Sequence, residues 1–241
     1  MNEHLSVGIH QPNFVPWLGY FLKISLSDYF VILDDVQFSR SRAARADFMK
    51  KNLEKIQLSI PVHLKNGFRT SYKEAIPVSE NRWRKKLLFQ LKENYSQTPH
   101  YHQLVDKIEE TIMINNTNLS EFNLNFINLF CKLINVRSKI IFSSDLDIQC
   151  ENANQRNLNL VRKLNGTIYW SGAGAAAYNH PAAFEKHNIS FRYATFNHEQ
   201  LKFIPENEKH CSLLHHLFKY GPAIVQDEIE QLKAKIEQNY E

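Results

Sequence analysis

Three short polar runs carry side chains suited to chemistry, and each directly follows an apolar stretch. They begin at His10, Asp34 and Ser171. An imidazole acts as a general base or as a hydrogen-bond donor to a phosphate. A carboxylate binds a proton, a ribose hydroxyl or Mg²⁺. The amides of a glycine-rich turn bind anions. Together these groups predict a site for a small anionic substrate.

His10 closes an apolar stretch and precedes Pro12, whose ring stiffens the following turn. We interpret His10 as a catalytic general base; the alternative is a strand-end histidine bonded to the backbone. Gln11 and Asn13 follow it. They either bind substrate or satisfy the polar backbone groups of the loop.

Asp34 and Asp35 are adjacent, so on a strand their side chains point to opposite faces. Only one is expected in the site, and Asp34 is the catalytic candidate. Asp35 either binds substrate or pairs with a nearby arginine, and a turn-starting aspartate is the alternative reading of both.

The following segment, Ser39–Asn52, reads as polar and basic. Its arginines suit a diphosphate because the guanidinium fork binds phosphate oxygens in pairs. A solvated loop is the equal alternative. The candidate substrate-binding residues here are Arg40, Arg42 and Arg45.

Ser171, Gly172 and Gly174 form a strand-to-helix turn whose amides are candidates for binding an anion or an oxyanion. The turn is neither a P-loop nor a nucleophile elbow. Cys211 and His215 stand four residues apart, which is a metal-ligand spacing, but no third ligand is evident. We therefore predict no metal site.

The elements that position these residues alternate between strand and helix. Leu5–His10 and Tyr29–Leu33 read as buried strands around a helix at Trp17–Ser25, in which Trp17 is expected to be core. This alternation predicts an α/β fold with a largely parallel sheet flanked by helices. Because the carboxyl ends of parallel strands share one edge, His10, Asp34 and Ser171 are expected around one cleft.

Residues 80–135 read as helices, and we expect a helical subdomain inside a single α/β domain over 1–241. The formal net charge of +4 is too small to indicate a DNA-binding protein. The chain shows no CxxC pair, no signal peptide and no membrane-length apolar run. A cytoplasmic protein fits these features.

The strings IHQPNFVPWLGYF, YFVILDDVQF, YWSGAGAAAY and CSLLHHLFKYG resemble the WbqC-like family over about residues 6–222. The resemblance implies a role in bacterial surface-polysaccharide (O-antigen, lipopolysaccharide) biosynthesis, with transfer of a glycyl or other acyl group to an amino sugar. It adds Gln37 and Tyr178 to the substrate-binding candidates. The family's Trp and Asn-Arg-Asn cluster after VQF is replaced here by Ala43–Asp47.

The leading hypothesis is an N-acyl- or aminoacyl-transferase acting on a nucleotide-linked amino sugar, with acyl-CoA or an aminoacyl donor. RNA is a partner only if an aminoacyl-tRNA is that donor. One alternative is an ATP- and Mg²⁺-dependent ligase or nucleotidyl transferase. Another is a non-catalytic protein that binds a nucleotide sugar or tRNA.

Overall fold

The fold is built on a five-stranded parallel sheet, seen in a computed structural model that describes residues 4–115, 117–172, 174 and 180–240. Its strands are β1 (Ser6–His10), β2 (Tyr29–Ile32), β7 (Lys139–Phe142), β8 (Ile168–Ser171) and β9 (Ser190–Tyr193). They lie in the order β7-β2-β1-β8-β9, and every neighbouring pair is parallel. The predicted α/β fold with a largely parallel sheet is confirmed.

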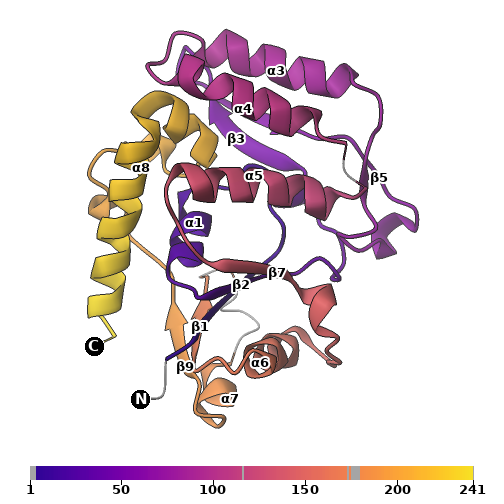
Figure 1. Ribbon diagram of the computed structural model, residues 1–241, viewed down its shortest axis with the longest axis vertical. Coiled ribbons are helices and arrows are strands. Elements are labelled where there is room, and N and C mark those ends of the chain that lie inside the picture. Colours follow the sequence, from indigo (N-terminus) through magenta and orange to yellow (C-terminus); the bar gives the residue numbers. More distant parts are fainter. Residues whose placement is uncertain (1–3, 116, 173, 175–179, 241) are drawn as a thin grey trace.

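Helices cover both faces of this sheet (Figure 1). On one face lie α1 (Leu18–Ser25), α5 (Leu119–Leu133) and α8 (Leu213–Gln238). On the other lie α6 (Ala153–Lys163) and α7 (Pro181–Glu185). Strands buried on both faces must be apolar throughout, which explains the continuous apolar runs in the sequence.

Alternate residues of the strands feed two separate cores, because successive side chains point to opposite faces. Val7 and Ile9 pack with the apolar side chains of α6 and α7. Phe30 and Ile32 pack in the larger core with α1 and α5. Gly8 lies between Val7 and Ile9, and a Cβ there would meet the Ser27 hydroxyl at 2.4 Å.

The helical middle of the chain consists of α3 (Arg82–Tyr95), α4 (Tyr101–Met113) and α5. The Asn118 side chain caps α5 by accepting a 2.9 Å bond from the Glu121 amide. Apolar residues of all three helices belong to the same core cluster as α1. The division of the chain into domains stays a prediction.

The segment read as polar and basic contains more structure than the sequence predicts. It holds the short helix α2 (Arg40–Ala43) and strand β3 (Arg45–Met49), which pairs antiparallel with β4 (Lys55–Ser59). A second small pair joins β5 (Val62–His63) to β6 (Ile76–Pro77). Short 3₁₀ turns lie at Gly67–Arg69, Ser143–Leu146, His198–Gln200 and Glu206–Glu208.

Helix α8 is kinked at Gly221, where the backbone adopts φ 83° before Pro222. A Gly-Pro pair is a common helix stop, but here it forms a kink between two helical segments. His100 packs directly on Gly221, and a Cβ there would lie 2.6–2.9 Å from its ring atoms. Only glycine combines this φ with this contact.

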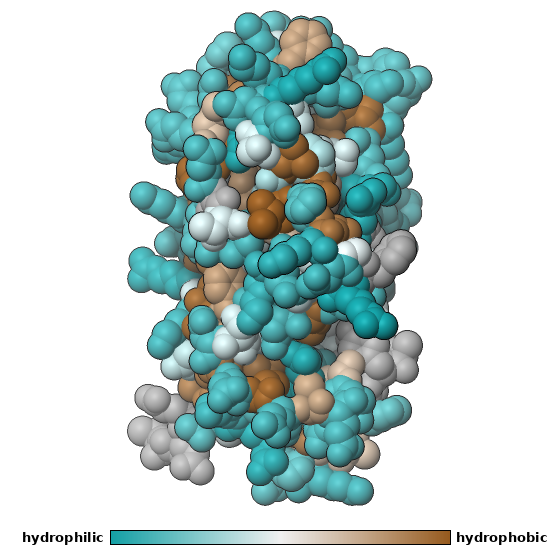
Figure 2. Space-filling view, turned by 90° about the vertical axis from the view of Figure 1, so that its right-hand side faces the viewer, coloured by the Kyte–Doolittle hydropathy of each residue, from teal (hydrophilic) through white to brown (hydrophobic). Residues whose placement is uncertain are grey.

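None of the helices in the described residues combines the length and apolar character needed to cross a membrane. Figure 2 shows one side of the molecule, where apolar side chains form small separate groups among hydrophilic ones.

Gly221→Ala should lower the free energy of unfolding by about 1–3 kcal/mol, because it adds backbone strain and a clash with His100. Gly67→Ala is the matched control, since Gly67 also has positive φ (55°) but nothing within 4 Å of a new Cβ. It should cost about 1 kcal/mol. Denaturant unfolding measures both, and equal losses would show that the His100 contact contributes nothing.

Candidate functional site

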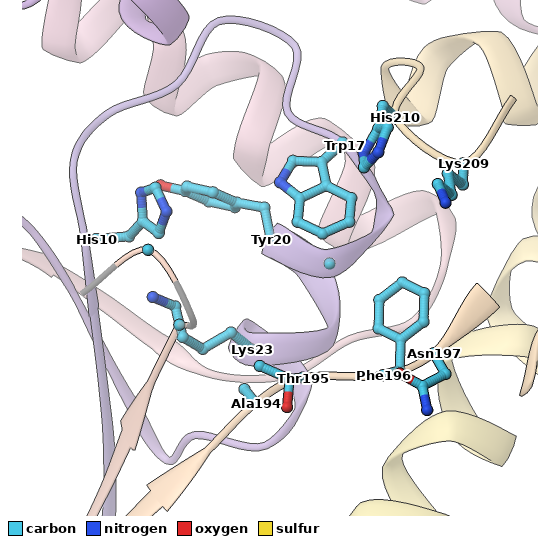
Figure 3. A pocket seen from close by; sticks show the side chains of 13 residues that line it. His10, Trp17, Tyr20, Lys23, Ala194, Thr195, Phe196, Asn197, Lys209 and His210 are labelled. Atoms are coloured by element: carbon cyan, nitrogen blue, oxygen red, sulfur yellow. The ribbon is translucent and has the colours of Figure 1, made fainter. Parts of the chain in front are cut away.

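The main cavity, of about 400 Å³, lies past the carboxyl ends of β1, β8 and β9. Its lining comes from the end of β1, one face of α1, the turn after β8, the loop after β9 and the segment before α8. Figure 3 shows side chains from these elements pointing around one hollow. This is the edge at which parallel α/β sheets bind ligands.

A second cavity, of about 350 Å³, adjoins the first. The residues that line both are His10, Lys23, Gly172 and Gly174. Gln11 lines only the second. The shared residues therefore stand at the centre of the hollowed edge of the sheet.

Lys23 is the most unusual of these residues, since its side chain is 4% exposed in an otherwise apolar helix. Its Nζ donates a 2.7 Å bond to the Ile9 carbonyl and lies 5.9 Å from the centre of the Phe30 ring. Among the described residues no carboxylate forms a salt bridge with it. Burial lowers its pKa from 10.5 to about 7.

The sequence reading overlooked Lys23, although a signal was present. Gly19 and Tyr20 lie four and three residues before Lys23, so both are neighbours of Lys23 on the surface of α1. All three line the cavity. A single lysine in a mostly apolar helix indicates that the lysine is buried along with its apolar neighbours.

His10 lies beside Lys23 at the end of β1. Its Nδ1 is 3.0 Å from the Gln11 carbonyl, which can only accept, so Nδ1 carries the proton and Nε2 holds a free lone pair. Enclosure of the ring and the nearby Lys23 lower the pKa of His10 to about 3. His10 is therefore neutral at pH 7, and a group of such low pKa is a weak base.

Tyr20 fixes the orientation of His10. The two rings make an edge-on contact with centroids 4.8 Å apart. The Tyr20 hydroxyl donates to the Gln11 carbonyl at 3.2 Å, and the Gln11 side chain accepts from Tyr72 at 3.0 Å. The predicted His10–Gln11 pair thus sits in a defined hydrogen-bond arrangement.

Asp34 follows the neighbouring strand β2, but its carboxylate turns toward the end of β7. It is buried and accepts bonds from the Ser144 amide at 3.0 Å and the Ser144 hydroxyl at 2.7 Å. Asp35 pairs with Arg156 at 2.8 Å. Neither aspartate lines the two cavities, so both contacts are those of loop anchors.

Ser171 is fully buried at the end of β8, whereas Gly172 and Gly174 open onto both cavities. A Cβ on Gly172 would lie 3.8 Å from the Lys23 Nζ atom, so the amine faces this turn. Tyr178 lies outside the described residues.

The arginine segment lies next to the cavity without lining it. Arg42 pairs with Asp47 at 2.8 Å, and Arg40 is exposed. Arg42, Arg45 and the buried Asn13 line a narrow crevice that touches the cavity at Trp17 and His210. Gln37 is exposed and bridges to Ser71.

The outer half of the cavity is aromatic and was not predicted. Trp17, expected in the core, is instead half-buried and lines the cavity. Its ring centroid lies 6.0 Å from those of Phe196 and His210. Strand β9 ends at Tyr193, and the residues that follow it, Ala194–Asn197, line this half of the cavity.

Glu208, His215 and His216 place ligand-type atoms within 4.8 Å of one another. Glu208 already bonds His215 at 3.0 Å, Tyr220 at 2.8 Å and the Lys219 ammonium. His215 also bonds the Tyr95 hydroxyl at 2.8 Å. A cation would have to displace these bonds, so we interpret the cluster as a structural anchor. Cys211 is not part of it.

Comparison with known proteins gives two matches. The sequence profile of the WbqC-like protein family matches residues 11–227. The uncharacterized protein Rv1507c of Mycobacterium tuberculosis is 27% identical over 195 residues, which cover 80% of this chain and 83% of that protein. No solved structure matches the chain.

Lys23→Met should raise stability most at low pH. The unfolded lysine binds a proton below about pH 10.5 and the folded one only below about 7. Between these values the unfolded state holds more protons, so the stability of the parent protein rises with pH. The advantage of Lys23→Met should therefore shrink by about 2–5 kcal/mol from pH 7 to 10.

Denaturant unfolding at several pH values measures this difference. Lys163→Met, which removes an exposed lysine of α6, is the control and should show no such trend. A pH-independent difference for Lys23→Met would mean that the amine stays charged in the folded protein.

Proposed function

The chain belongs to the WbqC-like protein family, and we propose that it transfers an acyl or aminoacyl group to the amino group of a nucleotide-linked amino sugar. The observation that carries this proposal is the buried amine of Lys23. It lies in a cavity at the ligand-binding edge of the sheet and has a pKa of about 7. An amine of this kind takes up and releases a proton at neutral pH.

Amide formation needs such a base, because a sugar amine is protonated near pH 7 and an ammonium has no lone pair for attack. Lys23 in its neutral form accepts one proton from that ammonium. The freed amine then attacks the acyl carbonyl, and a carbon–nitrogen bond forms. The bond from the carbonyl to the leaving group breaks, and the leaving group takes the second amine proton.

His10 suits a supporting role in this reaction. Its neutral ring offers Nε2 as an acceptor that holds the acceptor amine in place, next to Lys23. The glycine turn at Gly172 and Gly174 faces the Lys23 amine. It remains the candidate for stabilising the oxyanion of the tetrahedral intermediate. Asp34 does not line the cavities, so we propose for it only the indirect role of anchoring its loop.

The purified protein should be incubated with nucleotide-linked amino sugars and, in separate reactions, acyl-CoA, aminoacyl-tRNA, or a free acid with ATP and Mg²⁺. Mass spectrometry then detects the acylated sugar. Product with acyl-CoA or aminoacyl-tRNA supports the proposal. Product only with ATP and Mg²⁺ identifies a ligase instead, and no product in any reaction contradicts both.

Lys23→Met should reduce turnover by roughly 10²–10⁴ without loss of folded protein, since it removes the base but keeps the length of the side chain. In the parent enzyme the rate should rise as pH increases through about 7, because the neutral amine is the active form. Lys163→Met should retain full activity. An unchanged pH profile in Lys23→Met would exclude Lys23 as the base.

A further inference from the structure

We propose that the aromatic outer half of the main cavity binds the nucleoside diphosphate of the substrate, with the base against Trp17 and Phe196 and the phosphates at Lys209 and His210. This rests on the proposed function, which places the amino sugar at Lys23. It moves the diphosphate away from the arginine segment, where the sequence alone puts it.

The aromatic wall offers a ring-shaped surface for a planar base. The rings of Trp17 and Phe196 are tilted by 31° to one another, and both are half-buried beside the cavity (Figure 3). Nucleic-acid bases stack on such rings whatever their hydrogen-bonding edge. The Thr195 and Asn197 residues in the same wall supply polar groups for a base or ribose.

Trp17 packs against the first turn of the helix that follows it. A Cβ on Gly19 would lie 2.4–2.8 Å from atoms of the Trp17 ring, so the indole packs directly on Gly19. Trp17 directly precedes α1, and the Lys23 base projects from the same short helix. This links the aromatic half of the cavity to the reactive half.

A lysine and a histidine lie next to the aromatic wall: the His210 ring centroid is 6.0 Å from that of Trp17, and the neighbouring Lys209 pairs with Glu206 at 3.1 Å. Lys209 and His210 both line the cavity. Partial burial and the nearby cations Lys209, Lys55 and Arg42 lower the pKa of His210, against a raising effect of Asp47. The Lys209 ammonium attracts an anion, and Lys209 and the His210 ring both have N–H donors for phosphate oxygens.

The segment that carries Lys209 and His210 is fixed on both sides. Glu208, just before it, is 2% exposed and bonded to His215, Lys219 and Tyr220. Ser212, just after it, bridges to Trp17. The N–H groups that would donate to the phosphates are thus preorganised next to the aromatic wall. A fixed segment loses less conformational entropy on binding than a mobile loop would.

Isothermal titration with ADP, GDP, UDP and dTDP tests the subsite without any acyl donor. At least one should bind, and its affinity should fall about tenfold or more in Trp17→Leu, Phe196→Leu and Lys209→Ala. Gly19→Ala should weaken binding as well, because it displaces the indole without removing it. Circular dichroism should show that each variant is folded.

Matched controls come from a neighbouring part of the same loop. Phe203→Leu removes a 39% exposed phenylalanine and Lys202→Ala an exposed lysine, and neither residue lines the cavity. Both should bind within twofold of the parent protein. Failure of all four nucleotides to bind, or equal binding by the folded Trp17, Phe196 and Lys209 variants, overturns the subsite. Nucleotide binding with no acyl transfer would uphold it and contradict the proposed function alone.

Discussion

The hydrogen bond from the Lys23 amine to the Ile9 carbonyl ties the first helix to the first strand and sets the character of the site. Within the part of the chain that the structure describes, the neutral Ile9 carbonyl is the one acceptor for this normally charged group. Desolvation of an ammonium costs more than one such bond returns, so the amine loses its proton more easily. The same enclosure keeps His10 neutral. The reactive state of both residues therefore follows from the packing of α1 on β1.

The order of the strands decides which polar groups meet that amine. With β1 at the centre, its end adjoins β8 on one side and β2 on the other. The glycine turn after β8 opens onto the cavities, whereas Asp34 after β2 turns to the residues that follow β7. Strand ends that share one edge of a sheet thus need not share one site.

Much of the fold was predictable because it depends on local patterns. The apolar runs that indicate the buried strands β1 and β2 act within a few residues. The site was predictable only in part. His10 and Gly172 follow from the rule that ligands bind at strand ends, but strand order is a long-range property. Trp17 and Lys209 line the same cavity, and the bridge from Trp17 to Ser212, far along the chain, brings their two segments together.

Two buried ionisable groups, Glu208 and Lys23, differ in whether their charge is fixed at neutral pH. For Glu208, burial raises the pKa, but bonds from His215, Lys219 and Tyr220 outweigh it and bring the pKa to about 2. Its charge is then fixed across the physiological range, which suits an anchor. Lys23 lacks such partners among the described residues, and its pKa lies at about 7. A buried lysine without a charged partner lowers the stability of the folded protein. Its position beside a cavity indicates that this loss of stability serves a function.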